Sequence, residues 1–253
     1  MKSEPTITVI TVCYNSGASL NRALKSVQAQ SWSKIEHIVI DGGSTDDTLK
    51  ILELNKEHLA YYSSEPDKGI YDAMNKGLDR ATGDIICFLN ADDYYSSEDV
   101  LSRVAKLMSE FELDALMGDV TFFHAANPER IVRRYRSDRF TPQRLAWGWM
   151  PAHPALFLCK SIVQRVGGFK TDYRIAGDFD YIARVFHGHK LRCKHLPDAL
   201  VHMQTGGAST VDWRAKLLLN REVLRSCREN GISTNLFMVL SKYPLKLLEF
   251  LIR

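Results

Sequence analysis

The sequence predicts an α/β protein with a doubly wound, mostly parallel sheet and helices on both of its faces. Short apolar runs alternate with segments of helical periodicity through the first half of the chain. The run at residues 85–89 is apolar throughout, as expected for a parallel strand covered on both faces. Polar clusters directly follow three of the runs, at the strand ends where such sheets bind ligands. The sequence therefore predicts one site that gathers all three clusters.

The first half alternates strand and helix. Strands are expected in four apolar runs, at residues 6–13, 35–40, 59–62 and 85–89. Apolar residues at helical spacing predict helices at residues 20–27 and 70–78. Ser44 and Asp47 have the spacing of a capping box, which predicts another helix that begins there and runs through Leu54.

The second half has a looser pattern. Helices are expected at about residues 98–111 and at residues 178–186, and strands at residues 116–123 and 155–159. Six arginines make the stretch between Arg130 and Arg144 basic. From Val211 the chain predicts a tail of two helices divided at Gly231, with the second interrupted at Pro244 and amphipathic at its end.

Composition bounds the function. The chain is 45% hydrophobic and 25% charged, which is typical of a folded globular protein. Its 33 basic against 30 acidic residues give no nucleic-acid signal. No run reaches the roughly 18 to 20 apolar residues of a membrane span, and no signal peptide opens the chain, so we expect a cytoplasmic protein. Five cysteines without a C-x-x-C pair are expected to be reduced core residues, namely Cys13, Cys87, Cys159, Cys193 and Cys227.

Asp92 and Asp93 give the strongest chemical signal. Two adjacent acids at the end of a buried strand repel each other unless a cation or a donor-rich ligand lies between them. Mg²⁺ or Mn²⁺ takes such oxygen ligands and keeps positions open for phosphates, so the loop would suit a nucleotide diphosphate. The alternative is a polar turn in which one of the acids caps the next helix.

Asp41 ends a strand of isoleucine and valine and precedes Gly42 and Gly43. Its carboxylate could accept hydrogen bonds from a base or a ribose, while the glycines let the backbone come close. The alternative is an ordinary turn acid, because strand–Asp–Gly turns are common.

Four segments together resemble the family 2 glycosyltransferases with the GT-A fold. They occur in the family's order and spacing, and are residues 5–15, 38–48, 65–77 and 88–93. The segment at 65–77 is similar to the branch that builds bacterial exopolysaccharide, capsule and lipopolysaccharide. The resemblance extends from residue 5 to about 210. It implies a GT-A domain at residues 1–210, with a nucleotide-binding half at 1–95 and an acceptor-side half at 96–210, followed by the tail at 211–253.

The resemblance implies roles for individual residues on the donor side. Asp92 is the metal-binding acid of the D-x-D motif with Asp93 as its supporting neighbour, and Asn90 stands where the family more often has Asp. Lys68 would reach a phosphate, unless it is a solvated loop lysine. The residues that the resemblance ascribes to donor nucleotide binding are Val12 and Tyr14 at the nucleobase, Asp41 as acceptor from the base, and Lys68, Asn90, Ala91 and Asp92.

The catalytic base aligns with Asp178. An inverting single displacement needs a carboxylate that takes the proton of the acceptor hydroxyl. Asp180 is a second candidate, and Asp178 could instead only cap the helix that it begins. Gly177 replaces the glutamate that usually precedes this acid in the family, which leaves open what orients the acceptor.

Two histidines and a tryptophan complete the predicted site. His202 corresponds to a histidine that ligates the metal from a position late in the chain in some members of the fold. The alternative is that it is structural, as an isolated histidine on a strand more often is. His153 resembles a family histidine on the acceptor side and would contact the diphosphate or the acceptor. Trp149 would stack on a sugar, unless it packs in the core.

The resemblance implies a metal-dependent inverting hexosyl- or N-acetylhexosaminyltransferase. It would use a nucleotide sugar, a UDP-sugar before a GDP- or dTDP-sugar, and a lipid-linked saccharide acceptor. From Arg214 onward eight Lys and Arg stand against three Glu, which suits either contact with the inner face of the cytoplasmic membrane or a solvated packed helix. The rival interpretations are a dehydrogenase, which lacks its G-x-G-x-x-G, and a non-catalytic sugar-nucleotide-binding or scaffold protein.

Overall fold

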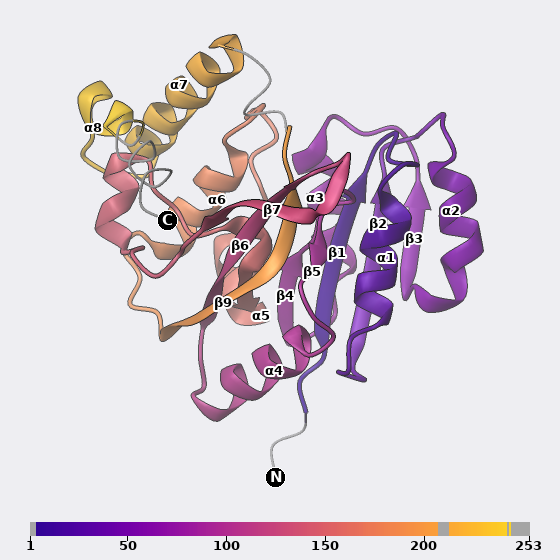
Figure 1. Cartoon of the computed structure of the whole chain (residues 1–253). Helices are drawn as coiled ribbons and strands as arrows, with labels where there is room; N and C mark the ends of the chain where they lie inside the picture. Colours follow the sequence, from indigo (N-terminus) through magenta and orange to yellow (C-terminus); the bar gives the residue numbers. More distant parts are fainter. Residues whose placement is uncertain (1–3, 207–212, 242, 244–253) are drawn as a thin grey trace.

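The computed structural model describes residues 4–206, 213–241 and 243 (Figure 1). Within these residues one sheet contains nine strands: β1 (Ile7–Cys13), β2 (Ile35–Asp41), β3 (Tyr61–Ser64), β4 (Ile85–Phe88), β5 (Tyr94–Tyr95), β6 (Ala115–His124), β7 (Asn127–Tyr135), β8 (Leu156–Cys159) and β9 (Cys193–Gln204). The α-helices are α1 (Leu20–Gln28), α2 (Thr48–Asn55), α3 (Ile70–Arg80), α4 (Val100–Glu110), α5 (Lys160–Val166), α6 (Gly177–Phe186), α7 (Trp213–Glu229) and α8 (Leu236–Leu240). Short 3₁₀ turns occur at Lys56–His58, Pro142–Trp147 and His153–Ala155.

The sheet has the order β3-β2-β1-β4-β8-β6-β9-β5, and β7 also pairs with β6. The four strands of the N-terminal half are all parallel, as is the β6–β9 pair, while the remaining pairs are antiparallel. Cys13 lies opposite Asp41, and Asp41 opposite Ser64. The carboxyl ends of β1, β2 and β3 therefore meet at one edge of the sheet, and β4, which precedes the third predicted polar cluster, runs parallel to β1 with Phe88 opposite Ile10.

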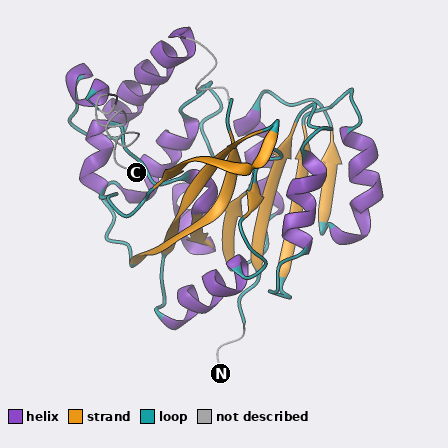
Figure 2. Cartoon of the chain, in the orientation of Figure 1, coloured by secondary structure: helices purple, strands orange, loops and turns teal. Residues whose placement is uncertain are grey.

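Helices cover both faces of this sheet (Figure 2). Every residue of β1 is buried, because its alternate side chains enter different apolar clusters. Ile10 packs in the cluster of α3, α5 and α6, whereas Val9 packs in the cluster of α4. Gly77 lets α3 lie directly on β1, since a Cβ there would come within 2.4 Å of the Ile10 Cγ2. The mixed α/β class with helices on both faces is confirmed.

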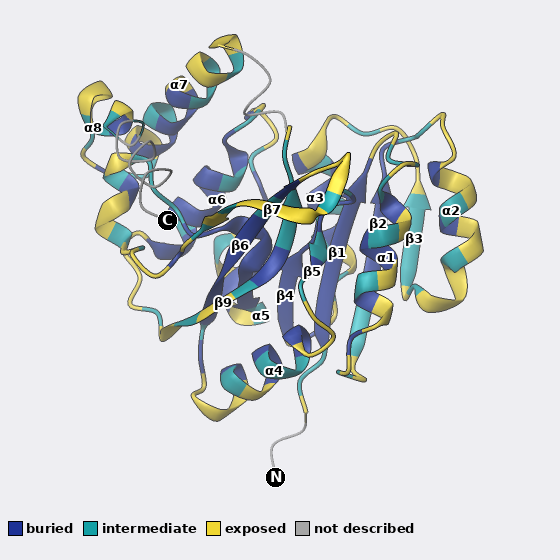
Figure 3. Cartoon of the chain, in the orientation of Figure 1, coloured by how far each residue is buried: buried dark blue, intermediate teal, exposed yellow. Residues whose placement is uncertain are grey.

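Most predicted elements are present, with boundaries shifted by a few residues. The structure adds β5, β7, β9 and α5, which the sequence patterns did not indicate. Three of the six arginines of the basic stretch, Arg130, Arg133 and Arg134, lie in β7, most of whose residues are exposed (Figure 3). The predicted capping box is wrong: Asp47 makes no side-chain capping bond to α2, and the Ser44 hydroxyl donates to the Asp41 carboxylate instead.

Among the described residues the five cysteines form no disulfide, and burial agrees with the prediction for Cys13, Cys87 and Cys227. Cys193 is exposed, so its expected place in the core is wrong. It opens β9, where only the later residues of the strand reach the core.

Helices α7 and α8 pack on the sheet domain. Val223 and Cys227 of α7 and Val239 of α8 belong to the same apolar cluster as α6. Asn235 caps α8 by accepting a hydrogen bond from the Met238 N–H at 2.9 Å. Among the described residues no helix is both long and apolar enough to cross a bilayer. The predicted interruption at Pro244 and the amphipathic end lie outside the described residues.

Candidate active site

The loops that follow β1 and β2 are joined by direct hydrogen bonds. Asn15 has a left-handed backbone, with φ of 49°, and its side-chain oxygen accepts from the Thr45 N–H at 2.9 Å. The Asn15 N–H donates to the Ser44 hydroxyl at 2.7 Å, and the Gly17 N–H to an Asp46 carboxylate oxygen at 2.9 Å. Two of the three predicted polar clusters therefore form one continuous rim at the carboxyl edge of the sheet.

Asp41 is completely buried below this rim. Its carboxylate accepts from the Ser44 N–H at 2.9 Å and from the Ser64 hydroxyl at 2.6 Å. Because these bonds fix the turn after β2, Asp41 has the structural role that the sequence left open as an alternative. A direct bond from Asp41 to a nucleobase stays a prediction.

The loop after β4 places Asp92 half-buried and Asp93 fully buried. Burial raises the pKa of Asp92, and burial together with the Asp92 charge raises the pKa of Asp93 well above its usual range. Asp93 accepts from the Gln204 N–H at 3.2 Å. Among the described residues nothing donates to the buried Asn90 Oδ1. The loop thus holds two poorly compensated acids and one unpaired acceptor.

Pairing of β5 with β9 brings His202 to this loop. His202 lies opposite Tyr94, the residue after Asp93, and the two rings are 4.9 Å apart between centroids. The His202 Nδ1 is 2.5 Å from the Thr121 hydroxyl oxygen, which leaves Nε2 as the nitrogen free to ligate. Burial lowers the pKa of His202, so the neutral form that binds metals is favoured.

Arg22 of α1 contacts the acidic loop, which the sequence did not indicate. Its Nη2 donates to the Asp92 carbonyl oxygen and to the Gln204 side chain, both at 3.2 Å. Its guanidinium lies over the rings of Tyr94 and Phe123. No local sequence pattern marks Arg22, because its contacts here are with residues about 70 and 180 positions away in the chain.

These side chains suit a divalent metal in part. Asp92 offers hard carboxylate oxygens and His202 one imidazole nitrogen, a set that Mn²⁺ accepts. Among the described residues, however, no three His, Cys, Asp or Glu side chains come close enough to hold an ion by themselves. A metal at this loop would have to complete its shell with the phosphates of a donor.

The other residues ascribed to the donor differ in exposure. Tyr14 is 64% exposed at the rim and Lys68 is also exposed, so both side chains can reach a ligand. Val12 and Ala91 are buried below the rim. They would therefore contribute to donor binding by shaping the bottom of the binding site.

Asp178 lies in the first turn of α6, on the face of the sheet that α3 also covers. Its Oδ1 accepts from the Phe179 N–H at 2.7 Å, and Ala176 rather than Asp178 is the residue that precedes the helix. Burial raises the pKa of Asp178 to about 6, and the Glu222 charge acts in the same direction. A carboxylate with this pKa can take up a proton near neutral pH.

Tyr71 occupies the space that a side chain at position 177 would need. A Cβ at Gly177 would lie 2.6 Å from the Tyr71 ring, so that ring fills the space of a side chain. The Tyr71 hydroxyl donates to the Ile175 carbonyl oxygen at 2.6 Å. Tyr71 of α3 therefore ties the donor half of the chain to the start of α6.

Asp180 serves the packing of α6. It is completely buried, and its two oxygens are engaged by Lys170 at 3.2 Å and Arg184 at 2.9 Å. Ser226 and Asn230 of the α7 region also donate to it. With both oxygens occupied, Asp180 is a poorer base than Asp178.

His153 is buried, and its ring stacks on Phe88 with centroids 5.2 Å apart. Burial lowers its pKa to about 4, so it is uncharged at neutral pH. Because Phe88 ends β4 just before the acidic loop, His153 lies near the donor side. Trp149 is half-buried, which suits either packing or a sugar contact.

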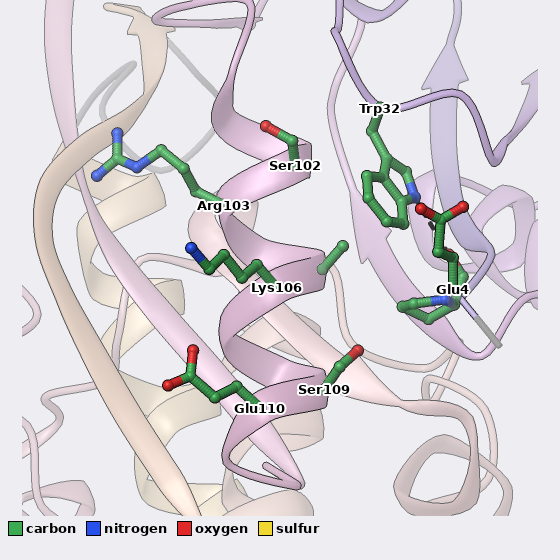
Figure 4. A pocket seen from close by; sticks show the side chains of 9 residues that line it. Glu4, Trp32, Ser102, Arg103, Lys106, Ser109 and Glu110 are labelled. Carbon is green, nitrogen blue, oxygen red and sulfur yellow. Dashed lines mark hydrogen bonds between the residues drawn. The ribbon is translucent and has the colours of Figure 1, made fainter. Parts of the chain in front are cut away.

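A separate groove of about 650 Å³ lies at the opposite edge of the sheet (Figure 4). Trp32 and Pro5, which precede β2 and β1, form one wall, and α4 forms the other. None of the predicted site residues lines it.

The parallel half-sheet, the acidic loop at its carboxyl edge and the carboxylate at the start of α6 define a GT-A-type protein. Residues 8–166 match the model of glycosyl transferase family 2, and the chain belongs to that family. It is 38% identical over 189 residues to an uncharacterized glycosyltransferase of Mycobacterium tuberculosis, covering 73% of this chain and 70% of that protein. It is 32% identical over 198 residues to a PGL/p-HBAD biosynthesis glycosyltransferase of the same species, covering 77% and 75% respectively.

Solved structures share the fold. Residues 1–349 of S. aureus TarS, in complex with UDP-GlcNAc, superpose with a TM-score of 0.71 at 20% identity, over 87% of this chain and 66% of that one. The mannosyltransferase PcManGT of Pyrobaculum calidifontis, in complex with GDP-Man and Mn²⁺, gives 0.65 at 22% identity, over 88% and 65%. The chain spans only 40% of the longer TarS structure, so the likeness concerns one part of that protein.

Proposed function

We propose that this glycosyltransferase moves a hexosyl or N-acetylhexosaminyl group from a nucleotide diphosphate, with inversion, to a hydroxyl of a lipid-linked saccharide during cell-surface polysaccharide synthesis. The observation that carries the proposal is Asp178, a half-buried carboxylate in the first turn of α6 whose pKa, raised to about 6, suits a general base. A UDP-sugar is the first choice and a GDP- or dTDP-sugar the alternative, because structural neighbours hold UDP-GlcNAc and GDP-Man.

On the donor side, the chain would hold the nucleotide against the rim of Tyr14 and the loop of Asp92. The unpaired Asn90 Oδ1 suits a ribose hydroxyl, which is a donor. Asp92 and the Nε2 of His202 would hold Mn²⁺ or Mg²⁺, and Asp93 would support them. When bound, the metal neutralises charge on the leaving diphosphate.

On the acceptor side, Asp178 would take the proton of the attacking hydroxyl while the sugar bond to the diphosphate breaks. Neutral His153 cannot repel a cation or attract the diphosphate by charge, so its part would be to shape the wall beside Phe88. Trp149 would offer an aromatic face to a saccharide.

We further propose contact with the inner face of the cytoplasmic membrane through α7 and α8. Trp213 is 68% exposed and Phe237 is 79% exposed, which is unusual for side chains of their size. Arg214 and Lys216 lie in the same first turn of α7 as Trp213, and basic residues are attracted to anionic lipids. Sedimentation with vesicles of anionic or of neutral lipid tests this proposal. A protein that binds neither kind of vesicle would refute it.

A thermal-shift screen of UDP-, GDP- and dTDP-sugars with and without Mn²⁺ identifies the donor, because stabilisation grows with ligand concentration over Kd. Nucleotide release and transfer to a lipid-linked saccharide are then measured with the best donor. We expect turnover that Asp178→Asn abolishes while nucleotide binding persists. Binding without turnover of any donor would favour the non-catalytic scaffold interpretation.

A further inference from the structure

Glu222 is a buried acid in the middle of α7, only 7% exposed. Its carboxylate accepts three consecutive backbone N–H groups, from Arg174 at 2.9 Å, Ile175 at 2.9 Å and Ala176 at 2.8 Å. These residues immediately precede Gly177, at which α6 begins.

Backbone donors alone compensate this carboxylate. Among the described residues no Lys, Arg or His forms an ion pair with Glu222, in contrast to Glu229 on the same helix, which pairs with Lys170 and Arg225. Hydrogen bonds from N–H groups to a charged acceptor are about twice as strong as neutral ones. Leaving three such donors unpaired in a buried place would be costly. The carboxylate therefore determines the path of residues 174–176.

This path fixes where Asp178 lies. Glu222 holds the loop from the α7 side, while the Tyr71 hydroxyl donates to the Ile175 carbonyl oxygen from the α3 side. Ala176 is both a donor to Glu222 and the residue that precedes α6. The first turn of α6, with Asp178 in it, is thus clamped between two helices.

We infer that Glu222 is a positioning residue that holds Asp178 in place for the transfer step, which makes α7 part of the acceptor side. The inference rests on the proposed role of Asp178 as the base. It adds α7 to the elements that support the proposed base; α6 and α7 both lie beyond residues 8–166, which match the family model.

The electrostatic surroundings give this inference a signature. Among the described residues, the Glu222 charge from α7 acts on Asp178, and Tyr71 from α3 lies close enough to feel the Asp178 charge. Burial and the Asp178 charge raise the pKa of Tyr71, so it stays a neutral donor. Removing the Glu222 charge should therefore lower the pKa of Asp178, which loss of folded protein alone would not do.

The test compares Glu222→Gln with wild-type protein in the sugar-transfer assay across pH 5 to 8. An amide has one acceptor oxygen instead of two, and its NH₂ would face an N–H donor. We expect kcat to fall by about ten-fold or more, as for a misplaced reacting group, with the donor KM unchanged. We also expect the acid limb of the pH profile to move to lower pH.

Two further variants separate the explanations. Glu229→Gln removes the same charge two turns along α7 without touching residues 174–176, and should leave kcat and the acid limb unchanged. Glu222→Asp keeps the charge but moves the carboxylate away from residues 174–176 by one methylene group. It should therefore lower kcat without moving the acid limb. This variant tests the inference if Glu222→Gln does not fold.

The outcomes are distinguishable. Wild-type protein that transfers no sugar refutes the proposed function, and the inference with it. Active wild-type protein with a folded Glu222→Gln variant that keeps its kcat and its acid limb refutes the inference alone. Faster hydrogen exchange at the amides of residues 174–176 in Glu222→Gln would support it independently of activity.

Discussion

The raised pKa of Asp178 predicts how the reaction rate depends on pH. As the proposed base, Asp178 must be ionised to accept a proton, and burial raises its pKa to about 6 from the usual value near 3.8. Because the pKa of an acid is raised, the active form is present above pH 6 and is lost as the pH falls through 6. The rate should therefore decline on the acid side well before an ordinary aspartate would protonate.

The size of the effect follows from the two pKa values. With a pKa of about 6, about 91% of Asp178 is ionised at pH 7 and about 9% at pH 5, so the rate should drop about ten-fold. With the usual pKa, about 94% would still be ionised at pH 5 and the rate would hardly change. The two cases differ by about an order of magnitude, which any steady-state assay resolves.

The assay is kcat measured at saturating donor and acceptor from pH 5 to 8. Donor affinity is measured in parallel, because burial also raises the pKa of Asp92 and acid could weaken metal binding. Thermal unfolding at each pH confirms that the protein stays folded. A kcat that stays level from pH 7 to pH 5, with donor still bound, would refute Asp178 as a base with a raised pKa.

Three further predictions concern the metal loop and the core. Asp92→Ala should abolish the extra thermal stabilisation that Mn²⁺ gives with a nucleotide sugar; an unchanged Mn²⁺ effect would remove Asp92 from the metal site. Asp180→Ala should cost about 2 kcal/mol or more in urea unfolding, because it removes a completely buried carboxylate from the half-buried Lys170 and Arg184 and takes their shared acceptor from Ser226 and Asn230. Asp172→Ala in an exposed ion pair should cost less than about 1 kcal/mol. Equal costs would contradict this. Gly77→Ala should destabilise by about 1–3 kcal/mol, because its Cβ meets the Ile10 side chain and outweighs the better helix propensity of alanine. A higher urea midpoint would show that the helix can move away.

Local sequence patterns predicted the N-terminal half well. The buried strand at residues 7–13 and the helix after it depend on apolar residues close together in the chain, and parallel pairing then brings the strand ends to one edge. The capping box failed because Ser44 had a competing acceptor: the Asp41 carboxylate lies three residues back, and burial makes its bond to Ser44 the more valuable one.

The sequence by itself determined the fold class, the family and the residues of the acidic loop. Only the tertiary structure decided what surrounds them. His202 reaches that loop through the pairing of β5 with β9, and Arg22 joins Asp92 to Gln204 from a helix. Glu222 supports the start of α6 from a helix about 46 positions along the chain. Such contacts leave no periodic trace in the sequence, because each depends on burial and on a partner that only folding brings near.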